Sequence, residues 1–584
     1  MDEQQKKLLE ELLFSGPKKP SFGKMLYFGI LDDSQIFPYP STPEDAAFQA
    51  EVKRFAEEQI DGAAIDRLAA IPESLIQGLG QLGVLGMTIP KEYGGLDLTQ
   101  RDYCKAIEIV SRRCGATALF INAHQSIGLK ALLLFGTDKQ KERWLKPLAT
   151  GKAIAAFALT EPNAGSDANG IETRAIYDKE KKVYRVSGRK QWITNGSMAQ
   201  VLTVMAKTEV QTPSGKEDKV TAFLVTPDMP GFIVEAAALE KVGMRGSKTA
   251  ILRFDNVEVP EENILGPLGG GLKVCLTVLD YGRTTFGATC TGAAKFLLEK
   301  SVEQAKNRYQ FKRPLASFGL VKEKLAKMKA LIYAMDATTY MTAGLVDKKV
   351  EDFMLELAIL KVFTSEALWQ IIYDTMQIYG GRSFFTDAPF ERMMRDGRLN
   401  MIGEGSNEVM RVFIGVVGMR DVGFQFKNFF EALQNPLENK EVLYHFMKQK
   451  ISAFKTPKIP TKSPELSKES ASLGSSIRSF GFNVAKLLGK YREDIVEEQL
   501  VLNRIANMAI AIYTSASVLS KLDTDLLQNE EHKSSTLKLD LGAGKLYCQI
   551  AQEVINTNHS LLFQNGDAKF IQLADLMTKS GYKV

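Results

Sequence analysis

Short segments rich in β-branched and aromatic residues fill the middle of this chain, from about residue 155 to residue 265. VYRVSGRKQWITNG, QVLTVMAKTE, VTAFLVTPDMPGFIVE and TAILRFDNVEVP are each flanked by turn residues. Segments of this length and composition are typical of β-strands. Their close succession predicts a small antiparallel barrel or sandwich, which no all-helical fold could accommodate.

Helical patterns flank this block on both sides. Apolar residues recur at helical spacing in AAFQAEVKRFAEEQI and IGLKALLLFGTDKQKERWL, and long helical patterns return from about residue 272 to 420. At 584 residues the chain is longer than one hydrophobic core spans, so we expect several domains in a mostly α, α+β fold. The predicted parts are an N-terminal extension (1–42), a helical domain (43–155), a β-barrel domain (156–265), a helical bundle (266–425) and a helical C-terminal extension (426–584).

The composition excludes several classes of protein. Hydrophobic residues make up 45% and charged residues 24%, as in ordinary globular proteins, and the net charge of +5 gives no reason to expect nucleic acid. The five cysteines form no CxxC pair, which argues for a reducing compartment and against a disulfide scaffold or structural zinc. The four histidines are too dispersed for a metal cluster, so no metal site is predicted.

The sequence shows no pattern typical of membrane spanning or export. No apolar run reaches the ~18 residues of a membrane span. The acidic, helix-like start MDEQQKKLLEELLF fits neither a signal peptide nor a transit peptide. We therefore expect a cytoplasmic protein, or a mitochondrial one if the source is eukaryotic.

A basic helical pattern in the C-terminal extension leaves two interpretations open. Apolar residues of KEVLYHFMKQKISAFK recur at helical spacing, and lysines dominate its charge. Such a helix can lie on the inner, anionic face of a membrane, or it can pack on the C-terminal domain with its lysines in water. The residues concerned, within a predicted membrane-associating segment 439–475, are Leu443, Phe446, Met447, Ile451 and Phe454, with Lys440, Lys448, Lys450, Lys455, Lys458 and Lys462 against Glu441 alone.

Two loop-like segments offer groups that suit a cofactor. FALTEPNAGSDANGIET (157–173) has small side chains, hydroxyls and free backbone N–H groups for a polar ring or a phosphate, although a surface turn has the same composition. RKQWITNGS (189–197) puts Trp192 beside Thr194 on a strand, where a tryptophan is more often part of the core. GPLGGGLKV is not a phosphate loop and no GxGxxG follows a strand, so a Rossmann domain is not expected.

Two further motifs contain acidic side chains. LDYGR places Asp280 and Arg283 three residues apart, on one helix face, as in an ordinary surface ion pair. MIGEGSNEVM (401–410) places Glu404 between two glycines, which allow backbone or substrate to approach closely. Taken alone, this pattern predicts a polar turn or the start of a helix around Glu404.

The order of these motifs resembles that of the acyl-CoA dehydrogenase family. IPKEYGG, LTEPNAGSD, WITNG, NRYQF, QIYGG, RMMRDGR and EGSNEVMR follow one another within residues 40–420. QIFPYPS, AHQSIGLKALLLFGT, FGLVKEKLAKM and the C-terminal extension are similar to the very-long-chain branch, which includes a respiratory complex I assembly factor. The resemblance implies a helical domain, a β-barrel and a helical bundle with an extra helical domain, in a homodimer that is peripheral to a membrane.

The resemblance also implies an activity. Members of this family convert a fatty acyl-CoA to its trans-2-enoyl-CoA, with FAD accepting two electrons that pass to electron-transfer flavoprotein. A carboxylate removes the α proton, and the family places it either where Glu404 stands or just before the arginine of LDYGR, which is Gly282 here. Glu404 is therefore the predicted base, with a pKa raised by burial and a backbone N–H that stabilises the thioester oxygen.

Other site residues are implied motif by motif. The residues predicted to bind FAD, some of them from a neighbouring subunit, are Phe157, Leu159, Thr160, Gly165, Ser166, Trp192, Ile193, Thr194, Arg308, Phe311, Phe318, Gln377, Ile378, Gly380, Gly381, Ser406 and Glu408. The residues predicted to bind acyl-CoA are Ser166, Asp280, Arg283 and Gly405.

Three positions depart from the family pattern. Gly403 replaces a bulky aromatic residue before the glutamate, which predicts a wider pocket or tolerated variation. Ser406 replaces the usual threonine, and Lys312 stands where a glycine usually follows the QF pair. None of these changes removes a catalytic group.

Two other functions are compatible with the same fold. An acyl-CoA oxidase would pass its electrons to oxygen and produce peroxide without another acceptor. An assembly factor would keep the fold without needing the chemistry. The presence of Glu404 and of the whole set of flavin motifs argues against a purely structural role, although it leaves room for a second one.

Overall fold

The computed structural model describes residues 20–40, 45–213, 215–435, 438–441, 443–444, 448, 455–528 and 535–579. The described chain forms two compact units. The first contains Ser41–Val350 and Leu360–Asn407, and the second contains Pro17–Pro40, Glu351–Ile359 and Glu408–Val584. The division of the chain into five parts stays a prediction.

Helices open the first unit, as the periodicity of residues 43–150 predicts. Side-chain caps mark several of their starts: Thr137, for example, forms a capping box with Gln140 at the start of α9. The elements are α3 (Ala46–Gln59), α4 (Gly62–Leu68), α5 (Glu73–Gln81), η2 (Val84–Gly86), η3 (Lys91–Tyr93), α6 (Gln100–Ser111), α7 (Gly115–Asn122), the π-helical η4 (Ala123–Leu129), α8 (Lys130–Phe135) and α9 (Asp138–Ala149).

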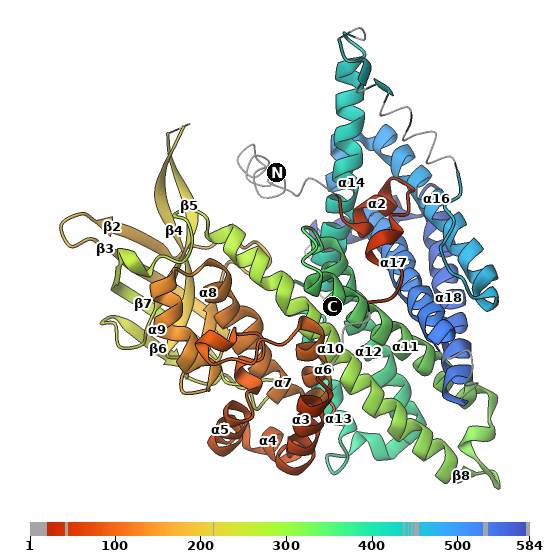
Figure 1. The fold of residues 1–584 in the computed structure, drawn as a ribbon, viewed down its shortest axis with the longest axis horizontal. Coiled ribbons are helices and arrows are strands. Elements are labelled where there is room, and N and C mark those ends of the chain that lie inside the picture. The colour runs from red at the N-terminus through yellow and green to blue at the C-terminus, as the bar shows by residue number, and fades with distance from the viewer. Residues whose placement is uncertain are drawn as a thin grey trace. The chain divides into compact units, whose positions relative to one another are not determined.

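A curled sheet follows these helices (Figure 1). Its strands are β1 (Ala155–Ala158), β2 (Arg174–Asp178), β3 (Val183–Thr194), β4 (Val201–Thr212), β5 (Gly215–Val225), β6 (Phe232–Ala236) and β7 (Thr249–Pro260). They pair in the order β1-β4-β2-β3-β7-β6, and β5 also pairs with β4. The expected β module is confirmed, but the expectation that it is antiparallel is wrong for β1 and β2, which run parallel to β4. The connections that lead from β1 and β2 to β4 are long enough to allow parallel pairing.

Long helices complete the first unit. Helix α10 packs against α6, α11 and β5, so it joins the bundle to the sheet (Figure 1). The elements are η5 (Glu261–Asn263), α10 (Gly271–Asn307), β8 (Tyr309–Gln310), β9 (Arg313–Pro314), η6 (Leu315–Ser317), α11 (Gly319–Asp347), α12 (Met354–Tyr379), of which the part from Leu360 belongs to this unit, η7 (Gly380–Phe384) and α13 (Phe390–Leu399).

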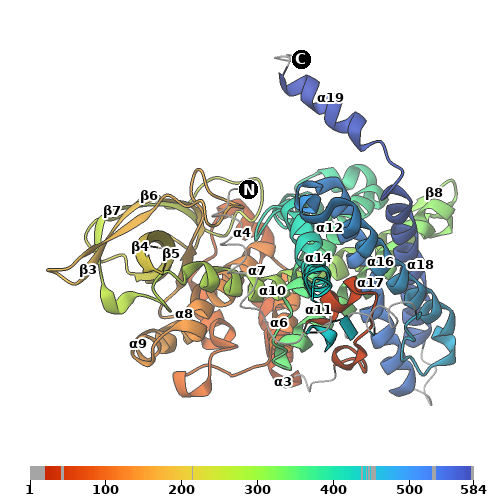
Figure 2. The same ribbon diagram turned by 90° about the horizontal axis from the view of Figure 1, so that it is seen from above.

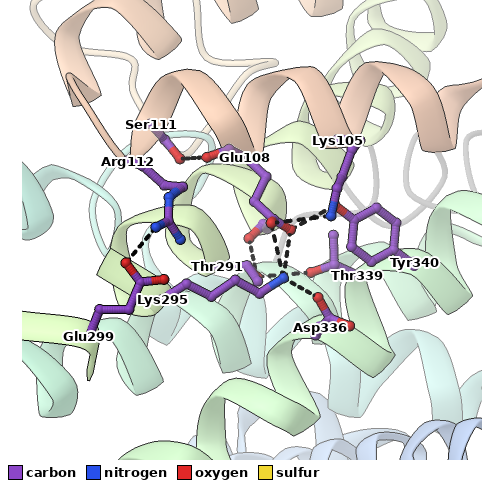
Figure 3. A network of polar contacts seen from close by, with 11 residues as sticks. Lys105, Glu108, Ser111, Arg112, Thr291, Lys295, Glu299, Asp336, Thr339 and Tyr340 are labelled. Atoms are coloured by element: carbon purple, nitrogen blue, oxygen red, sulfur yellow. Dashed lines mark hydrogen bonds and ion pairs between the residues drawn. The ribbon is translucent and has the colours of Figure 1, made fainter. Parts of the chain in front are cut away.

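A half-buried ionic network ties α6, α10 and α11 together (Figure 3). The ammonium group of Lys295 lies 2.9 and 3.0 Å from the carboxylate oxygens of Glu108 and also pairs with Asp336. The hydroxyl of Tyr340 donates to Glu108 at 2.7 Å. These neighbouring carboxylates raise the pKa of Lys295 against the effect of burial, so the lysine stays charged in the bundle.

The second unit brings the described N-terminal residues together with the C-terminal helices. The Tyr27 hydroxyl donates to the carbonyl of Ile414 at 2.7 Å, and its ring lies 4.9 Å from that of Phe480. Figure 2 shows α16, α17 and α18 side by side, with α19 projecting from them and burying none of its side chains. The elements are α2 (Phe22–Tyr27), η1 (Asp33–Gln35), α14 (Asn407–Ala432), which belongs to this unit from Glu408, η8 (Pro464–Leu466), α16 (Ser467–Tyr491), η9 (Arg492–Glu497), α17 (Gln499–Gln528), α18 (Ser535–Leu561) and α19 (Asp567–Lys579).

Two helical stretches of the described chain are long and apolar enough to cross a membrane, although polar or charged residues interrupt the apolar run in each. They are Gly115–Phe135 and Gln499–Gln528, and 72% and 89% of their most apolar windows are buried within the protein. Buried core helices of this length pass the same test of composition. The predicted basic helix is only partly described: Phe446, Met447, Lys450, Ile451 and Phe454 lie outside the described residues.

The β8–β9 hairpin explains why a glycine suits the position of Lys312. Its two turn residues, Phe311 and Lys312, have φ angles of +49° and +62°, the left-handed region that a tight two-residue hairpin turn requires. A glycine adopts this conformation freely, whereas a side chain costs about 1–2 kcal/mol there.

We therefore expect Lys312→Gly to stabilise the protein, by roughly 0.5–1 kcal/mol once the extra freedom of glycine in the unfolded chain is subtracted. The midpoint of chemical unfolding should rise. Lys306→Gly is the matched control, because Lys306 lies in the last turn of α10, where glycine lowers stability by about 1 kcal/mol. A fall in the midpoint for Lys312→Gly would contradict this account.

Candidate functional site

Glu404 occupies a tight turn between α13 and α14. The N–H of Gly403 donates to Leu399 O at 2.9 Å, and the N–H of Asn407 donates to Met401 O at 3.1 Å, which closes the turn. Glu404 has a φ of +55° and Gly405 a φ of +92°. A glutamate in the left-handed region is strained, and such strain concentrates at functional sites. The turn therefore holds a carboxylate where the backbone alone would favour glycine.

The carboxylate of Glu404 lies against Gly282 of α10. A Cβ atom added to Gly282 would stand only 2.9 Å from Oε2 and 3.1 Å from Oε1 of Glu404. Oε2 is buried and has no hydrogen-bond partner among the described residues. The two positions that the resemblance offers for a base therefore meet at one point, and Gly282 leaves the space that the Glu404 carboxylate fills.

Two buried cations act on this carboxylate. Burial raises the pKa of Glu404 to about 7, and the nearby charges of Arg283 and Lys361 oppose this rise. Arg283 is itself buried, with its Nη1 donating to Asp280 Oδ1 at 2.5 Å. The interpretation of Asp280 and Arg283 as a surface ion pair is therefore wrong: both side chains lie inside the protein, next to the candidate base.

The LTEPNAGSD loop is tied to the sheet by a buried ion pair. Lys190 of β3 donates to Glu161 Oε1 at 2.6 Å and to Leu159 O at 2.9 Å, and the N–H of Thr173 donates to Glu161 Oε1 at 3.1 Å. Burial lowers the pKa of Lys190 to about 8 in spite of the attraction of Glu161. Burial alone would raise the pKa of Glu161, but Lys190 and the hydrogen bonds hold it below its ordinary value.

A β-bulge exposes Trp192 beside this loop. The register of β3 and β7 shifts between Lys190 and Ile193, and Trp192 has a φ of +59°. Its side chain is 63% exposed, whereas Ile193 packs in the core of the sheet. The N–H of Gln191 donates to Thr160 O at 2.9 Å, which joins the bulge to the LTEPNAGSD loop. The common interpretation of a strand tryptophan as core does not apply here.

Several of the residues predicted to bind the cofactor present an open backbone or a partly exposed side chain. A Cβ atom added to Gly165, Gly380 or Gly381 would meet nothing within 4 Å, so these backbones are open to a ligand. The side chains of Phe157 and Ile378 instead pack in hydrophobic cores, and only their backbones remain for binding. The half-buried residues are Leu159, Thr160, Thr194 and Ser406, and the exposed ones include Ser166 and Glu408.

A third group of predicted residues lies on the β8–β9 hairpin and at the end of α12. Phe311 is 88% exposed and meets Phe318 edge to face at 6.2 Å, and the guanidinium of Arg313 lies 4.0 Å from the Phe318 ring centroid. Arg308, Gln377, Gly380 and Gly381 are also exposed. An exposed aromatic and cationic surface of this kind suits a nucleotide or a partner protein.

The sequence analysis missed two sets of functional candidates. Lys361 stands in the apolar run LAILKVF, and a single charge in such a run is a signal that the charged group needs a partner. Glu161 lies in LTEPNAGSD and Lys190 in RKQWITNGS, where glycines, hydroxyls and an aromatic side chain are the more prominent features. Only the fold shows that these two charges meet.

Comparisons with known proteins match nearly all of this chain. Residues 42–152, 156–257 and 269–418 match the N-terminal, middle and C-terminal domains of acyl-CoA dehydrogenases, and residues 464–580 match the family described as ACAD9/ACADV, C-terminal domain. The human very long-chain specific acyl-CoA dehydrogenase, a mitochondrial protein, is 38% identical over 521 residues, which cover 87% of this chain and 79% of that protein.

Solved structures agree with this match. An acyl-CoA dehydrogenase from Bacillus anthracis in complex with FAD has a TM-score of 0.79 and 28% identity, and the alignment covers 96% of this chain and 95% of the other. The butyryl-CoA dehydrogenase of Megasphaera elsdenii has a TM-score of 0.62 and 32% identity, over 65% of this chain and all of its own (100%).

We expect Lys190→Met to destabilise the protein by about 3–5 kcal/mol, because it leaves the buried Glu161 carboxylate without its cation. The free energy of unfolding and the content of bound flavin should both fall. The double variant Lys190→Met, Glu161→Gln removes both charges and should recover much of the stability. Equal losses for the single and the double variant would contradict a buried ion pair.

Proposed function

The chain belongs to the acyl-CoA dehydrogenase family and catalyses the FAD-dependent dehydrogenation of acyl-CoA thioesters, and on this premise we propose that Glu404 is the base that removes the α proton. The observation that carries this proposal is the buried Oε2 atom of Glu404, which has no partner among the described residues and is held in a strained turn. A carboxyl group with a pKa of about 7 is half ionised near neutral pH, as general-base catalysis requires.

The proposed step is a proton transfer from the α carbon of the substrate to Glu404. The carboxylate is favoured at the start by the charges of Arg283 and Lys361. Burial favours the neutral acid that the transfer forms. The surroundings of Glu404 therefore stabilise both the carboxylate before proton transfer and the carboxylic acid after it. FAD, when bound, supplies the acceptor for the β hydrogen and two electrons. The backbone N–H of Glu404 would stabilise the thioester oxygen as charge develops on it.

We assign the remaining predicted residues to FAD and to acyl-CoA because the chain belongs to the acyl-CoA dehydrogenase family. Trp192, Thr194 and the LTEPNAGSD loop would hold the flavin ring, and Asp280 and Arg283 would contact the pantetheine or nucleotide part of CoA. A Cβ atom added to Gly403 would meet only Leu399, at 3.6 Å or more, which leaves room beside the base for a long acyl chain. We therefore propose long or very long acyl-CoA as the substrate and electron-transfer flavoprotein as the acceptor.

The exposed hairpin and the end of α12 support a homodimer. Besides Phe311, the side chains of Tyr373, Phe384 and Phe385 are 55%, 81% and 62% exposed. Aromatic side chains are enriched in interfaces and are rarely left this exposed without a partner. We propose that this surface meets a second copy and contributes to the FAD site of that copy.

Glu404→Gln should retain FAD and bind acyl-CoA, but long-chain acyl-CoA should bleach its flavin absorbance roughly a thousandfold more slowly than in the wild type, in anaerobic stopped-flow measurements. Gln keeps the shape of the side chain and cannot accept the proton at neutral pH. Glu431→Gln is the matched control, because Glu431 is an exposed glutamate near the end of α14 and belongs to none of the predicted sites. Normal bleaching by Glu404→Gln would refute the base, and rapid peroxide formation by the wild type without another acceptor would favour an oxidase.

A peripheral membrane contact is a further part of the proposal. The described lysines of the basic segment, Lys440, Lys448, Lys455, Lys458 and Lys462, are all exposed. Exposed lysines near an anionic bilayer are attracted by about 1 kcal/mol each. Long acyl chains partition into bilayers, so such a contact would bring the enzyme to its substrate.

Replacing these lysines by glutamine should lower binding to phosphatidylserine vesicles by roughly 100-fold or more in flotation assays. Bleaching by soluble acyl-CoA should stay unchanged. The control replaces an equal number of exposed lysines in the first unit, Lys53, Lys91, Lys139, Lys146 and Lys152. Equal losses in both variants would show non-specific attraction, and no loss in either would exclude the segment as a membrane contact.

A further inference from the structure

Lys361 is a fully buried lysine that packs beside the Glu404 turn. It lies on α12, and none of its side chain is exposed to solvent. A buried ammonium group is costly unless acceptors and opposite charges surround it. The hydrogen-bond partners of Lys361 therefore indicate which part of the protein this buried lysine stabilises.

These partners are parts of the turn that follows Glu404. Lys361 Nζ donates to Gly405 O at 2.6 Å and to Asn407 Oδ1 at 2.8 Å. The amide nitrogen of Asn407 in turn donates to Ser365 Oγ and to Glu366 Oε1, each at 3.1 Å. The amide of Asn407 is thus fixed with its oxygen toward Lys361, and α12 holds the turn on both sides of Ser406.

The titratable groups that interact with Glu404 come from three helices. Arg283 on α10 and Lys361 on α12 are positive, and Tyr103 on α6 is a neutral phenol whose pKa is raised, chiefly by burial. Lys361 itself faces Glu404, Arg283, Cys290 and Glu366. Burial lowers the pKa of Lys361 to about 8, against the attraction of Glu404, so the lysine is mainly charged at neutral pH.

We propose that Lys361 is a positioning residue for Glu404, which fixes the turn through Gly405 O and Asn407 Oδ1 and keeps the carboxylate ionised before proton transfer. This inference rests on the proposed role of Glu404 as the base. Arg283 also lies beside the carboxylate and acts on it more strongly than Lys361 does, while its guanidinium donates to Asp280. Lys361 adds its own charge and also holds the turn, through a backbone carbonyl and an amide oxygen.

The first test measures the ionisation of Glu404 without turnover. Infrared difference spectra of the holoenzyme are recorded across pH, and the protonated-carboxyl band that Glu404→Gln removes is followed. The wild type should titrate near pH 7. Lys361→Met has a similar length without the charge, and it should raise the midpoint by about one pH unit, a tenfold shift in the equilibrium. Lys361→Gln keeps a donor for Gly405 O without the charge, and it should raise the midpoint similarly.

The second test follows the rate of anaerobic flavin bleaching by acyl-CoA over the same pH range. Below the raised midpoint, Lys361→Met should be about tenfold slower than the wild type, because less Glu404 is ionised. The rate should recover as the pH rises above that midpoint. A purely structural loss would persist at every pH.

Lys130→Met is the matched control. Lys130 is another buried lysine with a pKa lowered to about 8 by burial, but its ammonium group lies 4.8 Å from the Tyr281 ring centroid and it is not among the charges that act on Glu404. This variant should lose stability and leave the carboxyl midpoint unchanged. An unchanged midpoint in both Lys361→Met and Lys361→Gln would overturn the inference. Normal bleaching by Glu404→Gln would instead overturn the base, so the two failures are distinguishable.

Discussion

Helix α10 is buried along most of its length, and the first unit is arranged around this requirement. It packs against α6 and α11 in the bundle and against β5 of the sheet. Its buried threonines bond within the helix, as when Thr289 donates to Thr285 O at 2.9 Å, which satisfies these hydroxyls inside the bundle. One rigid helix therefore carries both Lys295 of the ionic network and Gly282 and Arg283 of the candidate site.

The charged groups of the interior occur in sets that compensate one another. Lys295 lies between Glu108 and Asp336, Lys190 lies against Glu161, and Arg283 against Asp280. Ion pairs of this kind add little net stability, but removing one partner is strongly destabilising. The Oε2 atom of Glu404 is one of several buried side-chain atoms that have no hydrogen-bond partner among the described residues. What sets Glu404 apart is that this atom combines with a strained turn and with two nearby cations, Arg283 and Lys361.

The sequence predicts the architecture of the protein but not the details of its packing. Periodicity predicts the helical and β blocks, and the structure confirms both, although the parallel pairing of β1 and β2 with β4 depends on long connections that no local pattern reveals. The motifs also locate Glu404. Burial of Asp280 and Arg283, exposure of Trp192 at a bulge and burial of Ile378 could not be predicted, because each depends on which elements pack over the residue.

The sequence alone determines the order of the motifs and the helical and strand periods, because these depend on local propensity. It also determines that the glutamate stands at position 404 and a glycine at position 282, because these are residue identities. Tertiary structure decided the rest. It placed the Glu404 carboxylate in the space that Gly282 leaves, and it brought Lys361 to the turn from more than forty positions away along the chain. A carboxylate becomes a candidate base only when helices distant in sequence remove it from water and surround it with charges, and that depends on packing.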